Sequence, residues 1–220
     1  MSEPVKPKRK YASARRAGQA ADTREAVLAA ARAQFIAAGW QGTTVAGIAR
    51  AAGVSNETIY AVFGTKQAVL LAVVERAVRR GEPGVPLLDQ AGPQAVAAAG
   101  DQRRQIALFA EDIARILGNV AELMAVVRAA ASSDPALAAL YRNLHEGRRR
   151  NLAFVIDALL KTGPLRPGLD ADAATATVWR LASPELFLLM RQVEGLTADR
   201  YAGWLADMLE AALLPGLSAR

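Results

Sequence analysis

Hydrophobic residues recur three or four positions apart along most of the chain, which is the spacing of one face of an α-helix. Val27, Leu28, Ala31 and Phe35 show this spacing first. The alternation of apolar and polar positions that marks a strand is not evident, and neither is an internal repeat. The pattern therefore predicts an all-α protein.

Helix boundaries follow from capping residues, prolines and glycines. In the first part of the chain the expected helices are 22–38, ended by Gly39, then 45–52, 56–62 and 65–80. Residues 81–100 are rich in proline and glycine and predict a linker or irregular loop with at most one short helix. Beyond it the helical spacing returns, near 101–117, 120–132, 135–161, 171–190 and 198–213. Pro184 begins a new helix or kinks the one that contains it.

Two of these helices, on either side of Gly53, are unusually short. Neither is stable alone, because isolated helices below roughly 12–15 residues are marginal in water. Ala49 and Gly53 predict a close crossing, Gly53 permits a left-handed turn, and Ser55 caps the second helix. Apolar positions suited to packing on the first helix are Ile48, Ala52, Val54, Ile59 and Val62. Such a braced pair fits a DNA major groove about 12 Å wide, while the alternative is an αα-hairpin that serves only as core.

Positive charge is concentrated at the start of the chain. Residues 1–80 carry 13 lysines and arginines against five acidic residues, whereas residues 81–220 carry 14 against 16. This asymmetry predicts an anionic partner for the first third, either nucleic acid or an anionic membrane surface. Residues 1–21 combine two prolines and many basic side chains with few large apolar ones, so we expect a disordered basic arm there.

Several function classes lack the residues they need. The chain has no cysteine and one histidine, His145, and shows no metal-ligand cluster. We therefore expect no enzyme, no metal and no cofactor, and we interpret His145 as a surface residue without a function. The sequence contains neither a signal peptide nor an apolar stretch long enough to span a membrane. The expected location is the cytoplasm, with association to the nucleoid when DNA is bound.

Residues 43–66 read Thr-Thr-Val-x-x-Ile-Ala-x-x-Ala-Gly-Val-Ser-x-x-Thr-Ile-Tyr-x-x-Phe-x-x-Lys. With this pattern the chain resembles the TetR family of transcriptional regulators, strongly from Thr23 to about Arg76. The resemblance is looser in LASPELFLLM and YAGWLADMLEAALLP. It implies an N-terminal three-helix helix–turn–helix domain and a C-terminal helical domain for ligand binding and dimerisation. On it the chain divides into the arm 1–21, a DNA-binding domain with its connecting helix at 22–80, and an effector and dimerisation domain at 81–220.

The resemblance also implies a function. A homodimer would bind a palindromic operator in double-stranded DNA and repress transcription until an unknown small-molecule effector binds. The competing interpretation is an architectural helical protein that binds DNA without sequence preference, and competition between a specific promoter fragment and bulk DNA separates the two.

The resemblance assigns DNA contacts to individual residues. Thr44 and Tyr60 match positions that contact phosphates, and so does Lys66 at the start of the fourth helix. The recognition helix begins after Ser55, and its first turn, which reads base edges, consists of Asn56, Glu57 and Thr58. Glu57 is unusual for the family; it either reads a base or favours the positive end of the helix.

Two positions depart from the family's pattern. After Ile-Tyr the family commonly has an aromatic residue or arginine and then histidine, where this chain has Ala61 and Val62. Two side chains that often touch DNA are therefore replaced, although Ala61 can meet a thymine methyl group. The basic arm compensates by entering a minor groove or neutralising phosphates, and its expected contacts are Arg9, Lys10, Arg15 and Arg16.

The C-terminal part is expected to dimerise and to bind the effector. Segments 171–190 and 198–213 have broad apolar faces, and in the family two late helices form a four-helix bundle across the two-fold axis; the alternative is a purely internal core. Six large side chains are candidates for lining an effector pocket, although each also suits plain core: Phe109, Met124, Tyr141, Phe154, Trp179 and Phe187. The arginines at 148–150 are interpreted as a solvated face, with pairing to an acidic effector as the alternative.

Overall fold

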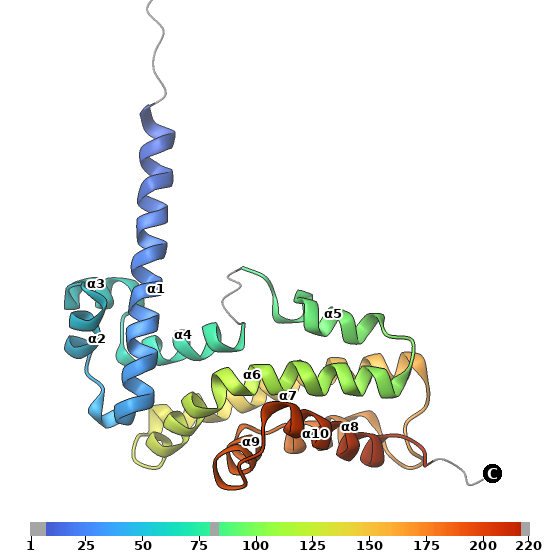
Figure 1. Cartoon of the computed structure of the whole chain (residues 1–220). Coiled ribbons are helices and arrows are strands. Elements are labelled where there is room, and N and C mark those ends of the chain that lie inside the picture. Colours follow the sequence, from blue (N-terminus) through green and yellow to red (C-terminus); the bar gives the residue numbers. More distant parts are fainter. Residues whose placement is uncertain (1–7, 80–83, 217–220) are drawn as a thin grey trace, which may run out of the picture. The chain divides into compact units, whose positions relative to one another are not determined.

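The computed structural model describes residues 8–79 and 84–216, and within these ranges the chain is helical throughout, with no strand. The predicted all-α class is confirmed. The chain forms two compact units, residues 1–73 and residues 74–220, and Figure 1 shows the helices of each. Because the two units are separate bodies, each is described by itself.

The N-terminal unit consists of α1 (Lys8–Gly42), α2 (Val45–Ala52), α3 (Asn56–Phe63) and the first part of α4 (Lys66–Val78). Its core is formed by side chains that are almost fully buried, one or more from each helix: Phe35, Ile48, Ile59 and Leu70. Trp40 stacks on Phe35 at a centroid distance of 6.0 Å. Each of the four helices therefore contributes one apolar face to this small core.

Helix α1 begins much earlier than expected. The sequence predicts a start at Asp22 or Thr23, after a disordered arm, but the helix runs from Lys8. Residues 8–21 are mostly alanine, lysine, arginine and glutamine, all strong helix formers, and extending an existing helix requires no new nucleation. The disordered-arm prediction is therefore wrong from Lys8 onward, and residues 1–7 lie outside the described residues.

The C-terminal unit contains the end of α4, a 3₁₀ turn and six further α-helices with one π-helical turn. Their bounds are η1 Leu87–Asp89, α5 Ala91–Ala98, α6 Gln102–Ala131, α7 Pro135–Thr162, α8 Ala171–Leu181, α9 Pro184–Leu188, η2 Leu189–Val193 (the π-helical turn) and α10 Ala198–Leu213. Helix α6 is central, since it packs against α5, α7, α9 and α10. Side chains of Asp134, Asp170 and Thr197 cap α7, α8 and α10.

One predicted boundary in this unit is wrong and another is confirmed. Helix α6 is continuous where a break was expected between 117 and 120. Gly118 is exposed, and a glycine there costs only about 1 kcal/mol, less than interrupting a helix whose Leu117, Val120 and Ala121 are buried. The segment 171–190 is interrupted at Ala182–Ser183, and Pro184 begins α9, which confirms the prediction that this proline begins a new helix.

The described helices are short or polar relative to the thickness of a bilayer. None of them alone is long and apolar enough to cross a bilayer; α3 and α4 meet the length and composition criteria only when joined across a bend of 67°.

Candidate nucleic-acid interface and ligand cavity

Two helix N-caps and one left-handed glycine fix the turn between α2 and α3. The Thr44 hydroxyl accepts a hydrogen bond from the Gly47 amide at 3.0 Å and caps α2. Gly53 has φ 68° and ψ 31°, a left-handed conformation that costs glycine little, and the amide of Val54 donates to the Ala49 carbonyl at 3.0 Å. The Ser55 hydroxyl then accepts from the Thr58 amide at 3.2 Å and begins α3. The predicted left-handed turn at Gly53 and the predicted cap at Ser55 are confirmed.

The close crossing lies at a different glycine from the one predicted. A Cβ on Gly53 would meet nothing within 4 Å, so this residue serves the turn alone. A Cβ on Gly47 would lie 2.8 Å from Oε1 of Gln34, a residue of α1. The tight contact therefore joins α2 to α1 rather than α2 to α3, and the sequence pattern has no means of distinguishing the two glycines.

The first turn of α3 faces solvent. Ile59 is 1% exposed and anchors the helix in the core, whereas Asn56, Glu57 and Ala61 are exposed and Thr58 is partly so. Tyr60 is 54% exposed. Val62 is 45% exposed, so the prediction that it packs against α1 is wrong. Its side chain belongs to the outer surface of α3, which gives this surface an apolar element.

The Glu57 carboxylate is held at the N-terminus of α3. Hydrogen bonds from its own backbone amide, and then from the Ser55 hydroxyl, lower the pKa of this carboxyl. The negative charge therefore lies at the positive end of the helix dipole. Because Glu57 is also exposed, its two predicted roles, base reading and stabilisation of the helix end, both stay predictions.

Lys66 makes contacts inside the N-terminal unit that the sequence does not indicate. Its ammonium donates to the carbonyls of Trp40 and Thr43, both at 2.7 Å, and lies 3.9 Å from the centroid of the Trp40 ring. Burial lowers the pKa of Lys66. Two of its three N–H groups are thus occupied by the end of α1, which leaves one for the phosphate contact that the resemblance assigns to it.

The predicted arm residues are part of α1. Arg9, Lys10, Arg15 and Arg16 lie in its first turns, but their side chains are outside the part of the chain that the structure describes. Figure 1 shows this half of α1 continuing past α2 and α3. Further along α1, the Arg24 guanidinium lies 4.6 Å from the centroid of the Phe63 ring and ties the helix to the end of α3.

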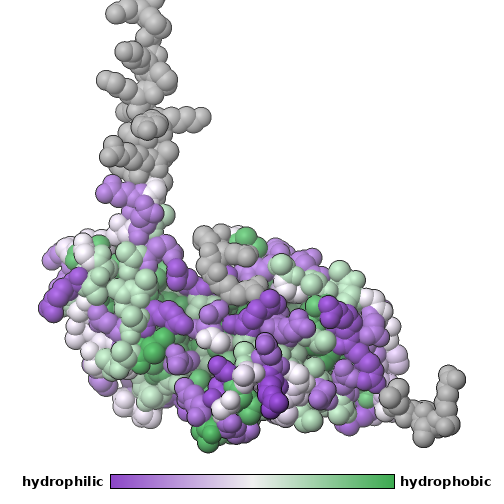
Figure 2. All heavy atoms as spheres, in the orientation of Figure 1, coloured by the Kyte–Doolittle hydropathy of each residue, from purple (hydrophilic) through white to green (hydrophobic). Residues whose placement is uncertain are grey.

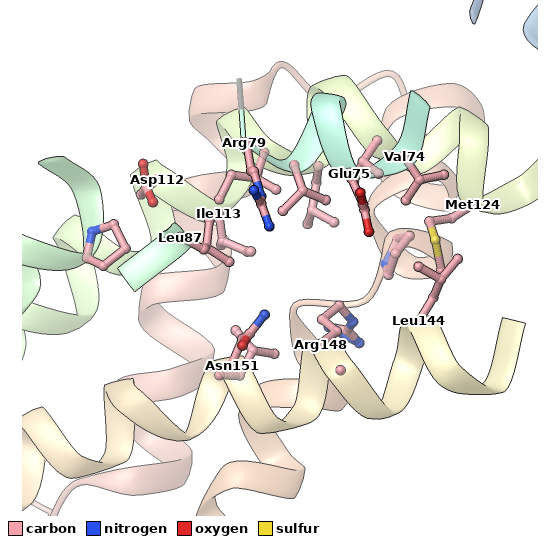
Figure 3. A pocket seen from close by; sticks show the side chains of 18 of the residues that line it. Val74, Glu75, Arg79, Leu87, Asp112, Ile113, Met124, Leu144, Arg148 and Asn151 are labelled. Atoms are coloured by element: carbon pink, nitrogen blue, oxygen red, sulfur yellow. The ribbon is translucent and has the colours of Figure 1, made fainter. Parts of the chain in front are cut away.

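A cavity of about 300 Å³ lies within the C-terminal unit, enclosed by the end of α4 and by α6 and α7 (Figure 3). Most of its lining is apolar, including Val74, Ile113, Met124, Leu144 and Leu152. We call it the apolar cavity. Its volume is at the lower end of the range found for small-molecule sites.

A few polar side chains border the apolar cavity. Figure 3 shows Glu75 and Arg79 extending from α4 and Arg148 and Asn151 from α7. Asp112 of α6 is 5% exposed and packs so closely on α5 that a Cβ on Gly92 would lie 2.2 Å from its Cγ. Convergent polar groups in an apolar lining are typical of sites that orient a ligand.

The structure brings together half of the predicted pocket residues. Phe109, Met124 and Phe154 line the apolar cavity, and the two phenyl rings meet edge to face at 6.4 Å. Tyr141 and Trp179 line a different hollow, and Phe187 is buried against Tyr201 at 4.8 Å. A search for large aromatic side chains misses the polar residues Arg148 and Asn151, although their spacing from Leu144 places all three on one face of α7.

On α7, Arg149 and Arg150 are exposed as interpreted, whereas Arg148 is not a solvated residue and His145 is not a surface residue. Arg148 does not face solvent: its Nη1 donates to the Ala182 carbonyl at 3.2 Å and its Nη2 to the Trp179 carbonyl at 2.5 Å. Desolvation lowers the pKa of Arg148 to about 10. His145 is also enclosed, with a side chain 13% exposed between Tyr141 and Trp179. Among the described residues, no group of histidines and carboxylates is arranged to hold a metal ion.

Comparison with known proteins identifies the N-terminal motif. The family model for "Bacterial regulatory proteins, tetR family" matches residues 27–73. A comparison with curated proteins gives no match.

Solved structures share the fold over most of the chain. The fatty acid degradation regulator FadR from Bacillus halodurans has a TM-score of 0.68 at 18% identity, covering 90% of this chain and 97% of that one. A TetR-family regulator from Mesorhizobium loti gives 0.65 at 20%, covering 88% and 98%. A regulator from Saccharomonospora viridis in complex with choline gives 0.64 at 20%, also covering 88% and 98%. The N-terminal motif therefore matches the tetR family of bacterial regulatory proteins in sequence, and the chain shares the fold of solved TetR-family transcriptional regulators over most of its length.

Proposed function

We propose that this regulator is a ligand-responsive repressor that binds a palindromic operator as a homodimer in the cytoplasm, associated with the nucleoid when DNA is bound. The observation that carries the proposal is the solvent-facing first turn of α3, with Asn56 and Glu57 exposed on a helix anchored by the buried Ile59. A short helix braced in this way fits the major groove with its N-terminal residues at the base edges. We assign residues 22–80 to DNA binding and residues 81–220 to effector binding and dimerisation.

The apolar cavity is the proposed effector site. Its lining calls for a small, largely apolar molecule with one polar group, the latter placed against Arg148 or Asn151. Helix α4 supports a response to this molecule, because Val74 and Val78 line the cavity while the same helix begins at Lys66 in the N-terminal unit. The choline bound by the Saccharomonospora viridis regulator is a precedent for a small ligand on this fold.

The last helices are the proposed dimer interface. Leu189 is 48% exposed and Val193 76% exposed in the π-helical turn, and Met208 of α10 is 39% exposed. Figure 2 shows hydrophobic groups at the surface where Figure 1 labels α9. Exposed apolar side chains of this size favour a protein contact. Light scattering after size exclusion tests it: the wild-type protein should have the mass of a dimer, and Val193→Lys should shift it towards a monomer, whereas a monomeric wild type would refute the interface.

Selection of bound fragments from a random DNA library tests the DNA-binding proposal. A palindromic consensus with half-sites about one helical turn apart is the expected result. Enrichment of no sequence, together with equal competition by bulk DNA, would instead support the architectural alternative.

The effector response has its own test. Candidate apolar ligands should release the selected operator from the wild-type protein, and Met124→Arg, which places a charge in the apolar cavity, should abolish this release while leaving operator binding intact. Release that is unchanged in Met124→Arg would place the effector elsewhere.

A further inference from the structure

A second hollow in the C-terminal unit lies among α7, α8 and the start of α9, and has a volume of about 560 Å³. Every residue that lines it has a side chain able to carry charge or form a hydrogen bond. Helix α7 contributes Tyr141, His145 and Arg148, α8 contributes Trp179 and Arg180, and α9 contributes Glu185. We call it the basic hollow, since its chemistry is opposite to that of the apolar cavity.

The charge balance of the basic hollow is positive. Arginines 142, 148, 149 and 180 line it, against glutamates 146 and 185. Arg149 is already paired with Asp172 at 3.2 Å, and its charge is offset there. Arg142 and Arg180 are exposed at the rim, so they raise the local positive potential without being committed to a described hydrogen bond.

Unpaired polar atoms are concentrated around the same hollow. Among the described residues that line the hollow, four buried side-chain nitrogen atoms make no hydrogen bond: Nδ1 and Nε2 of His145, Nε of Arg148 and Nε1 of Trp179. The arginine and indole nitrogens can only donate, and an imidazole carries at least one N–H. Native proteins rarely leave buried donors unpaired, so this cluster lacks an acceptor.

The protein's own nearby carboxylate pairs with only part of this cluster. Oε1 of Glu185 accepts the Tyr141 hydroxyl at 2.8 Å and forms an ion pair with Nε2 of His145 at 3.6 Å, which leaves Nδ1 of His145, Nε of Arg148 and Nε1 of Trp179 without an acceptor. The guanidinium of Arg148 is directed to the Trp179 and Ala182 carbonyls. A bound anion would supply acceptors to these three donors.

We propose that the basic hollow binds an oxyanion, namely the carboxylate or phosphate group of a small molecule. Arginine N–H groups match the oxygens of both anions, and the indole N–H adds a fixed donor. The volume exceeds that of an inorganic ion, which leaves room for the organic part of the molecule beside the Tyr141, His145 and Trp179 rings.

This site is separate from the proposed effector site, although Arg148 lines both. Trp179, Arg142 and Arg180 line the basic hollow alone, and Met124 lines the apolar cavity alone. Variants at these positions therefore test one site without the other, and the failure of either proposal leaves the other standing.

Indole N–H resonances give a direct readout on the full-length protein, because its three tryptophans are Trp40, Trp179 and Trp204. The protein is titrated with inorganic phosphate, with phenyl phosphate and with benzoate at constant ionic strength maintained by sodium chloride. The Trp179 signal, identified by its loss in Trp179→Phe, should shift saturably with at least one of the three probes while those of Trp40 and Trp204 stay in place. Comparing the probes shows whether phosphate or carboxylate is preferred and whether the aromatic ring adds affinity.

Matched variants complete the test by calorimetry with the best probe. Trp179→Phe, which keeps the ring but removes the donor, and the double variant Arg142→Gln/Arg180→Gln should each weaken binding by about tenfold. Arg150→Gln is the control, since this exposed arginine of α7 does not line the hollow, and it should bind as the wild type does. A non-saturating shift, equal movement of all three indoles, or equal weakening by Arg150→Gln would overturn the proposal, because each indicates solvation or general charge attraction.

Discussion

The recognition helix and the apolar cavity are built in opposite ways. The exposed surface of α3 depends on residues within about twenty positions of one another, through the caps at Thr44 and Ser55 and the left-handed turn at Gly53. The apolar cavity depends on α4, α6 and α7, whose contributing residues, from Val74 to Phe154, are separated by as many as 80 positions. The exposed surface of α3 is therefore specified by caps and a turn close to it in sequence, whereas the apolar cavity is specified by the packing of helices that lie far apart in sequence.

The largest effect expected is at the anchor of α3. Ile59→Ala removes a side chain that is 1% exposed, and should cost about 2–5 kcal/mol of stability and most of the DNA binding. Val62→Ala, one helical turn along but 45% exposed, should change stability by less than about 0.5 kcal/mol. Urea denaturation measures both. Equal losses of unfolding free energy in Ile59→Ala and Val62→Ala would contradict the view that only the Ile59 face of α3 anchors the helix.

A smaller effect is expected at a packing point of the C-terminal unit. Gly92→Ala places a methyl group against the buried Asp112 carboxylate and should cost about 1–3 kcal/mol, because the helix or the carboxylate must shift. Gly100→Ala is the matched control, since a Cβ there meets nothing within 4 Å. Thermal melts compare the two variants, and a neutral Gly92→Ala would show that α5 moves freely.

Acid should weaken the C-terminal unit through Glu185. His145 first, and then the Tyr141 hydroxyl, lower the pKa of Glu185 from 4.5 to about 2. A carboxyl with a depressed native pKa contributes its full stability above the unfolded pKa and loses it as the pH falls towards the native value. Stability should therefore decline between about pH 4.5 and pH 2. Urea midpoints across this range should fall less steeply in Glu185→Gln; parallel curves would contradict the prediction.

Deleting residues 2–16 should leave stability nearly unchanged and act on DNA affinity alone. Six of the lysines and arginines lie in this segment, and each DNA phosphate that the shortened protein no longer neutralises should flatten the plot of log K against log salt by about 0.9. Operator binding measured at several salt concentrations gives the slope. An unchanged slope would exclude the segment from the interface.

Local signals predicted the fold well, and long-range packing limited the rest. Thr44, Gly53 and Ser55 lie where capping and turn chemistry placed them, because their partners are within four residues. The predictions for Gly118 and Val62 are wrong because the roles of these residues depend on which helix faces them. The same reason separates Tyr141 and Trp179 from Phe109: aromatic character says that a side chain is buried, but not which of two cavities it borders.

Lys66 couples the start of α4 to the DNA-facing motif. One ammonium group holds the Trp40 and Thr43 carbonyls, and Thr43 immediately precedes the cap of α2. A rotation of the first turn of α4 about its own axis must either carry these two carbonyls with it or break two short charge-assisted bonds in a partly desolvated place. A rotation of α4 would therefore displace the backbone at Thr43, directly before the N-terminus of α2.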